Sequence, residues 1–121
     1  MGQLDVVEGV DGGVVVVCVR GDVDSSSVGA LADALDGGLS SGAAAPARVL
    51  IIDLTRVTYF GSAGLNAVLS CYERGRDDGV AVRVVADNPE VIRPIEVTKL
   101  DTVLRPYPSV AEALATDAGS L

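Results

Sequence analysis

The stretch RVLIIDLTRVTYFGSAGLNAVLSCYERG, residues 48–75, joins two patterns that together indicate the fold. Residues 48–54 are strongly apolar and rich in β-branched side chains, which predicts a strand. After a short link, residues 55–61, apolar side chains recur at helical spacing and predict a helix buried along one stripe. That stripe comprises Leu65, Val68, Leu69 and Tyr72. A strand followed by such a helix is the repeating unit of α/β proteins.

The flanking sequence continues this alternation. Apolar runs predict further strands, at residues 4–10, 14–20 and 80–86 and within 101–109. Helical spacing predicts further helices, around residues 28–35, within 87–100 and at 109–115. The order β-β-α-β-α-β-α-β-α predicts one α/β domain over residues 1–121, a central mixed, mostly parallel sheet with helices packed alongside. The first strand is expected at an edge, and residues 14–20 are expected to be buried on both faces.

Small and polar residues suggest where the first helix begins and ends. Asp24 or Ser25 is expected to cap its start, because short polar side chains accept the free amide hydrogens there. Gly37 and Gly38 are expected to end it. Residues 39–47 then form a loop.

The last third of the chain carries similar signals. Asn88 is expected to cap the third helix with Pro89 in its first turn, whereas Pro94 should kink it. Ser109 is expected to cap the last helix. Residues 116–121 are expected to be a frayed tail.

Composition limits the classes of function. The chain has 121 residues, 49% of them hydrophobic and 3% aromatic, so a core of aliphatic side chains is expected. A net charge of −8 argues against binding to nucleic acid or to an anionic membrane. No apolar run reaches the ~20 residues of a membrane span, and no secretion signal is recognisable, so a cytoplasmic protein is expected. Cys18 and Cys71 lie in apolar contexts and are expected to be reduced, largely buried thiols.

Enzymatic chemistry is not indicated. The chain has no histidine, so a Ser-His-Asp triad is impossible, and Lys99 is its only lysine. No cluster has the ligand spacing of a metal site, and no glycine-rich phosphate loop is present. We therefore expect a protein that is not an enzyme and uses no cofactor.

Ser62 is the residue with the most open interpretation. It lies where the strand–link stretch turns into a helix, so it can act as the helix N-cap. Its small neighbours Gly61, Ala63 and Gly64 leave the hydroxyl unshielded, so another protein can also reach and modify it. A helix start favours a phosphate through its free amides. A nucleophilic role is the third alternative, which the missing histidine disfavours.

Three segments resemble the anti-sigma factor antagonists, bacterial proteins of the STAS-domain family. VRGDVDSSS at 19–27 resembles the family's R-L-x-G-E-L-D segment. Residues 49–79 resemble its strand-loop-helix with the consensus D-L-S-x-V-x-F-x-D-S-[ST]-G-L, and residues 80–114 resemble the remainder. The resemblance covers about residues 10–115.

This resemblance implies a partner and a switch. In the family, the domain binds an anti-sigma factor with a histidine-kinase-like ATPase fold and so releases a sigma factor. The anti-sigma factor phosphorylates the first serine of the motif, here Ser62, and a serine phosphatase reverses this. The partner surface then combines the loop at 21–26 with the helix start at 61–66, since functional loops gather at the carboxyl ends of parallel strands. Its expected residues are Asp22, Asp24, Ser25, Gly61, Ala63, Gly64, Leu65 and Asn66.

The sequence departs from the family pattern at four positions. Gly61 replaces the family's Asp, and Ala63 replaces its second Ser or Thr. Pro94 interrupts the third helix, and Lys99 stands where the family often has Gly. An alternative function follows from Gly61: a STAS scaffold module in a larger signalling assembly, with Ser62 never phosphorylated.

Overall fold

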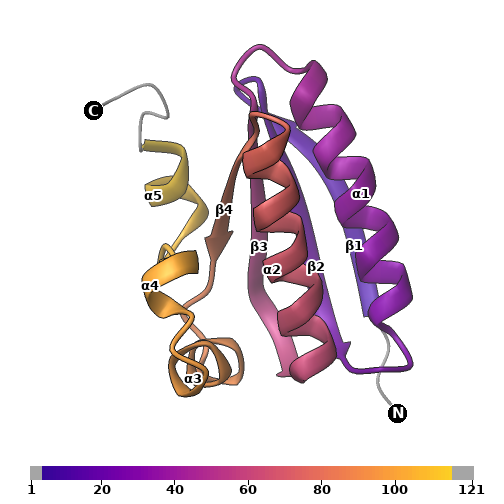
Figure 1. The fold of residues 1–121 in the computed structure, drawn as a ribbon, viewed down its shortest axis with the longest axis vertical. Helices are drawn as coiled ribbons and strands as arrows, with labels where there is room; N and C mark the ends of the chain where they lie inside the picture. Colours follow the sequence, from indigo (N-terminus) through magenta and orange to yellow (C-terminus); the bar gives the residue numbers. More distant parts are fainter. Residues whose placement is uncertain (1–3, 116–121) are drawn as a thin grey trace.

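Four strands form one mixed sheet in the order β1-β2-β3-β4 (Figure 1). The structure, a computed structural model, describes residues 4–115. Strand β1 is antiparallel to β2, and the other neighbours are parallel. The strands are β1 Leu4–Asp11, β2 Val14–Val23, β3 Val49–Phe60 and β4 Ala81–Val85. The predicted α/β class and the edge position of the first strand are confirmed.

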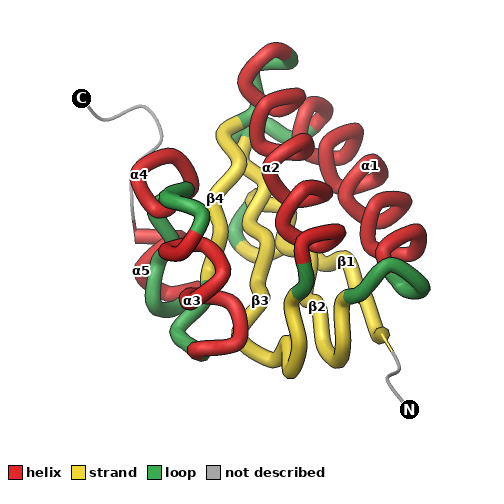
Figure 2. Tube along the Cα trace, turned by 60° about the horizontal axis from the view of Figure 1, so that its bottom comes forward, coloured by secondary structure: helices red, strands yellow, loops and turns green. Residues whose placement is uncertain are grey.

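The described part of the chain contains five helices, which differ in how much of the sheet they cover. They are α1 Val28–Ala44, α2 Ser62–Asp77, α3 Pro89–Val97, α4 Asp101–Leu104 and α5 Val110–Ala115. Figure 2 shows α1 and α2 side by side over one face, where they enclose the main core with side chains such as Val17, Leu50 and Val68. The short α5 packs on the opposite face, over a smaller cluster that includes Ile51 and Ala113.

Strand β2 shows that α5 covers only part of its face of the sheet. Val15, Val17 and Val19 are buried in the main core. On the other face, Val16 belongs to the cluster beneath α5, but Cys18 is exposed. The prediction that this strand is buried on both faces, and Cys18 with it, is therefore wrong. The reason is tertiary: α5 is only six residues long and contacts β3 and β4.

Helix α1 runs well beyond its predicted end. It passes through Gly37 and Gly38 and continues to Ala44, so the predicted loop at 39–47 is mostly helix. A Cβ on Gly38 would lie 3.0 Å from side-chain atoms of both Val17 and Leu50. In the same way, a Cβ on Gly42 would lie 3.2 Å from a methyl group of Val80. These glycines let the helix approach the sheet closely, and they do not end it.

Strand β3 is also longer than predicted. It extends to Phe60, so the segment 55–60 is strand rather than link. Its pairing with β2 shifts register between Cys18 and Arg20 and again between Gly21 and Asp22. Strand β3 therefore carries the chain directly to Gly61 and Ser62.

The third helix continues through its proline. Helix α3 includes Pro94 as an interior residue, and Val91 and Ile95 fix it in the core. Asn88 stands at its N-cap position without a side-chain cap bond; its amide instead donates to the carbonyls of Leu54 and Val57, at 3.1 and 2.8 Å. Lys99 has φ 61°, the left-handed region that favours glycine.

The end of the described chain differs from the predicted terminal strand. Helix α4 occupies Asp101–Leu104, and only Tyr107 pairs with the sheet, through a single parallel bridge to Val85. The Ser109 cap is confirmed, because its hydroxyl accepts the amide of Glu112 at 3.1 Å. The expected tail at 116–121 lies outside the described residues.

Arg48 joins the carboxyl ends of α1 and α2. Its guanidinium donates to the carbonyl oxygens of Ala43, Asp78 and Gly79, at 2.8, 2.7 and 3.1 Å. Because the last carbonyls of a helix lack intrahelical donors, one side chain here satisfies both helix ends. The backbone of Arg48 is left-handed, with φ 52°.

Candidate functional site

Asp24 organises the loop between β2 and α1. Its Oδ1 accepts the amides of Ser26 and Ser27, at 2.9 and 3.1 Å, and the Ser26 hydroxyl at 2.6 Å. The hydrogen bond from the Ser26 side chain, followed by the backbone bonds, lowers the pKa of Asp24 below its ordinary 3.8. Helix α1 nevertheless begins at Val28 with Ser27 at its N-cap position and no side-chain cap bond, so the predicted cap at Asp24 or Ser25 is wrong. Asp24 instead holds the turn that leads into the helix, and its carboxylate is charged at neutral pH.

Ser27 secures the same turn from the other side. Its hydroxyl donates to the carbonyl of Asp22 at 2.8 Å and accepts the amide of Asp24 at 3.0 Å. Ser25 takes no part in these bonds and is exposed. The turn therefore presents Ser25 and Ser26 to solvent from a backbone that side chains hold in place.

Ser62 is the first residue of α2, and its side chain is exposed. The N-cap position belongs to Gly61, which has no side chain to make a cap bond, so the N-cap interpretation of Ser62 is wrong. The hydroxyl of Ser62 makes no hydrogen bond to residues 4–115. It lies at the positive end of a helix dipole, free to be approached from solvent.

The structure brings the Asp24 loop and the Ser62 helix start together. Strands β2 and β3 end side by side, with Val23 paired to Phe60. The amide of Gly61 then donates to the carbonyl of Val23 at 3.0 Å. The Thr58 hydroxyl donates to Oδ1 of Asp22 at 2.5 Å, which adds a side-chain link between the two strands.

Two of the predicted partner residues are buried. A Cβ on Gly64 would lie 2.5 Å from Val23 and 3.0 Å from the Phe60 ring, so glycine is required for this packing. Leu65 is 4% exposed and belongs to the main core. Neither offers a side chain to a partner, whereas Asn66 is exposed and Ala63 is half-buried.

Tyr59 is a surface residue of the site that the sequence interpretation missed. Its side chain is 54% exposed, and its ring covers Gly61: a Cβ there would lie 3.2 Å from both Cε2 and the hydroxyl of Tyr59. The space that a side chain at position 61 would need is thus partly taken by Tyr59. An aromatic residue two positions before Gly61, in a segment interpreted as a link, gave no signal of this contact.

Neither a histidine nor a metal-binding cluster accompanies Ser62 in the described residues. No histidine exists to accept a proton from Ser62. Within residues 4–115, no group of three or more His, Cys, Asp or Glu side chains could hold a metal ion. Among the helices of this same range, none has the length and apolarity needed to span a membrane.

With this geometry in view, comparison with protein families identifies the class. The STAS domain model matches residues 6–113. The chain belongs to the STAS domain family. No curated protein matches it in sequence.

Solved structures of anti-sigma factor antagonists share the fold. The crystal structure of an anti-sigma factor antagonist from Mycobacterium paratuberculosis has 31% sequence identity and a TM-score of 0.85, over 95% of this chain and 94% of that chain. Unphosphorylated SpoIIAA, also an anti-sigma factor antagonist, has 16% identity and a TM-score of 0.70, over 100% of this chain and 99% of its own. The phosphorylated form of SpoIIAA, a Bacillus cell fate determinant, has 17% identity and a TM-score of 0.63, over 94% and 96%.

Proposed function

We propose that this protein is an anti-sigma factor antagonist that binds a kinase-fold anti-sigma factor and is released when that partner phosphorylates Ser62. The observation that carries the proposal is the Ser62 hydroxyl, exposed and without a hydrogen bond to the described residues, beside the ordered Asp24 loop. The similar antagonist from Mycobacterium paratuberculosis and the two forms of SpoIIAA support it. The protein acts in the cytoplasm and performs no catalysis; the kinase supplies ATP and the catalytic groups, and a serine phosphatase restores the free hydroxyl.

The proposed partner surface consists of Asp22, Asp24, Ser25, Gly61, Ser62, Ala63 and Asn66, with Tyr59 added. Gly64 and Leu65 support it from the core. The two aspartates favour a partner that carries basic residues at this point. The protein's charge of −8 gives no reason to expect nucleic acid or a membrane surface instead.

Phosphorylation would act locally. It adds about −1.5 to −2 charges, a modest change against a total of −8. At the interface, however, the phosphate takes up space beside Gly61 and Ala63 and brings like charge toward the Asp22–Asp24 segment. A cost of about 1–3 kcal/mol corresponds to roughly tenfold to a hundredfold weaker binding. The fold tolerates the anion because it lies at a helix N-terminus.

The test begins with a pull-down of the wild-type protein, followed by identification and purification of its partner. Incubation with that partner and ATP should add one phosphate to the wild type and none to Ser62→Ala, measured by intact mass. Ser62→Ala should bind constitutively, and Ser62→Asp should bind more weakly while melting near the wild-type temperature. Phosphate found on Ser62 without any loss of affinity would refute the switch.

A second candidate is a STAS scaffold module in a larger assembly. Gly61, with the Tyr59 ring over it, favours this function because the acidic residue that the family carries before the serine is missing. Recovery of other STAS proteins instead of a kinase-fold partner, with Ser62 unmodified, would support it.

A further inference from the structure

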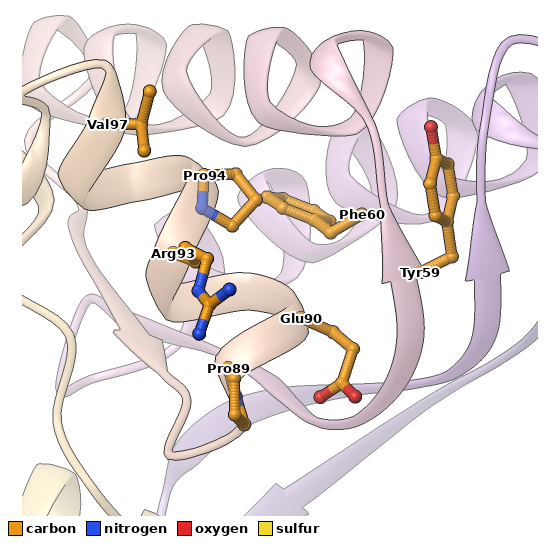
Figure 3. A pocket seen from close by; sticks show the side chains of 7 residues that line it. All are labelled: Tyr59, Phe60, Pro89, Glu90, Arg93, Pro94 and Val97. Carbon is orange, nitrogen blue, oxygen red and sulfur yellow. The ribbon is translucent and has the colours of Figure 1, made fainter.

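A groove lies beside the proposed partner surface, between the end of β3 and α3 (Figure 3). Its volume is about 490 Å³. Phe60, itself 4% exposed, forms part of its floor, and Figure 3 shows the Pro94 ring next to the Phe60 ring. The groove therefore has an apolar base at the carboxyl end of the sheet.

Helix α3 divides its side chains between the core and this groove. Val91 and Ile95 are buried. Glu90, Arg93, Pro94 and Val97 line the groove, at the i, i+3, i+4 and i+7 spacing that places residues on one helix face. Pro94 has no amide hydrogen to donate within the helix, and its ring adds apolar surface in the middle of this face.

The mouth of the groove exposes unusually large apolar side chains. Val97 is 75% exposed and Tyr59 is 54% exposed. Exposed apolar side chains that adjoin a hollow and are rimmed by charged groups are typical of a protein interaction site. Here Glu90 and Arg93 supply the charged rim.

Two observations indicate which molecule occupies the groove. First, it is continuous with the proposed partner surface, because Tyr59 lines the groove and its ring also covers Gly61, the residue before Ser62. Second, carboxylates adjoin the groove on the side of the proposed partner surface. Asp22 and Asp24 belong to that surface, Asp87 follows β4, and Glu90 lines the groove, where Arg93 is the basic residue.

We propose that the groove is a second contact for the anti-sigma partner of the proposed function, on which this inference rests. It receives apolar side chains of a partner segment that also carries Lys or Arg. The segment buries Val97 and one side of the Tyr59 ring, while its basic residues face Glu90 and the neighbouring carboxylates. The groove thus helps to select the partner, and Ser62 controls when that partner is held.

The experiment measures the affinity of the purified partner for matched valine variants by isothermal titration calorimetry. Val97→Gln removes the apolar contact from the groove, and we expect binding to weaken about tenfold. Val10→Gln is the control: Val10 is 72% exposed, nearly equal to Val97, but lies on the edge strand β1. We expect wild-type affinity for this control and a melting temperature near wild type for both variants.

The salt dependence of binding and amide hydrogen exchange provide two further tests. Glu90→Gln should flatten the salt dependence of binding, because it removes a carboxylate that faces basic partner residues. Addition of the partner to the wild-type protein should slow amide hydrogen exchange in residues 89–97 as well as at the start of α2.

The outcomes separate the two proposals. If Val97→Gln binds like the wild type while Ser62→Asp binds weakly, the groove contact is wrong and the proposed function stands. If the wild type binds no kinase-fold partner, both are wrong. Equal weakening by Val97→Gln and Val10→Gln would also overturn the groove contact, because it would show a general effect of lost surface valines.

Discussion

The two ends of the parallel strands are built in different ways. At the amino ends, Arg48 ties the last turns of α1 and α2 together through three carbonyl oxygens. Gly42 and Gly75 let the same helices pack tightly on the sheet there. At the carboxyl ends, the Asp24 loop is held mainly by its own side chains, and Ser62 makes no hydrogen bond to residues 4–115.

This difference separates stability from recognition. The hydrogen bonds of Arg48 and the close packing at the glycines join different elements at the amino end. This end is therefore sensitive to substitution, because a change at Arg48 affects two helices at once. The carboxyl end keeps a free hydroxyl and exposed side chains where a partner can compete for them. Substitutions at the first end should therefore alter folding. Substitutions of exposed side chains at the second end should chiefly alter binding, whereas Gly64 and Asp24 also contribute to stability there.

The largest effect is expected from Gly75→Ala. The new Cβ would lie 2.5 Å from a Val82 methyl and 2.9 Å from the carbonyl oxygen of Val80, and backbone cannot move aside easily. Urea denaturation followed by circular dichroism should show a free energy of unfolding lower by about 1–3 kcal/mol. Gly29→Ala is the control in α1: nothing lies within 4 Å of its Cβ position, so a gain of about 0.5–1 kcal/mol is expected. Equal stability of the two variants would refute the packing argument.

Arg48→Ala should have the next largest effect. Loss of the three hydrogen bonds at the helix ends should lower the free energy of unfolding by about 1–2 kcal/mol. Arg48→Gly loses the same bonds but relieves the left-handed backbone, φ 52°, so it should be less destabilised than the alanine variant. If the glycine variant were the less stable of the two, the backbone conformation would not be strained as described.

A smaller, pH-dependent effect is expected at Asp24. The folded-state pKa of this carboxyl is below 3.8, so its contribution to stability is present above that value and is lost as the pH falls through the folded pKa. The difference in melting temperature between the wild type and Asp24→Asn should thus be constant from about pH 5 upward and shrink in acid. Asp33→Asn, an exposed position on α1, is the control. A difference that grew in acid would contradict the hydrogen-bonded turn.

The smallest effect concerns thiol accessibility midway between the two ends. Cys71 on α2 is buried, and burial raises its pKa to about 12. Cys18 is exposed on the sheet face. Partial desolvation of the thiol and, to a smaller extent, the negative charge of Asp53 raise the pKa of Cys18 as well. An aromatic disulfide reagent should therefore label Cys18 in the native protein and Cys71 only on opening or unfolding.

The labelling rate of Cys71 in two variants tests whether the two ends of the strands behave independently. Gly75→Ala, one helical turn from Cys71, should accelerate its labelling. Ser62→Asp should leave the rate unchanged, because that residue lies at the end of α2 that faces solvent. Equal acceleration by both would mean that the two ends are not independent.

Local patterns in the sequence predicted most elements, because each needed only its own periodicity. The runs in β2, β3 and β4 and the stripe of α2 are examples. The glycines of α1 could not be interpreted in this way. Gly38 and Gly42 resemble helix terminators in isolation, and only the nearby Val17, Leu50 and Val80 side chains show that they are packing positions. Cys18 was misjudged for a similar reason, since the extent of α5 over the sheet is a tertiary property.

The site could be predicted in part. The rule that loops gather at the carboxyl ends of parallel strands correctly placed the Asp24 loop beside Ser62. It could not show that Gly64 and Leu65 point inward, because this depends on the angle at which α2 leaves β3. Tyr59 was missed because the strand was expected to end at residue 54. In a strand, successive side chains point to opposite faces, so the position of Tyr59 could be inferred only once residues 55–60 were known to be strand.

The direction of β1 has a practical consequence for fusion proteins. Because β1 is antiparallel to β2, Leu4 lies opposite Gly21, next to the proposed partner surface. A bulky reporter attached at Leu4 would therefore stand beside Gly21 and Asp22 and obstruct the partner. Helix α5, in contrast, packs on the opposite face of the sheet from α2. A label or surface tether placed on α5 leaves the proposed partner surface open, so immobilisation through this helix is the appropriate geometry for binding measurements.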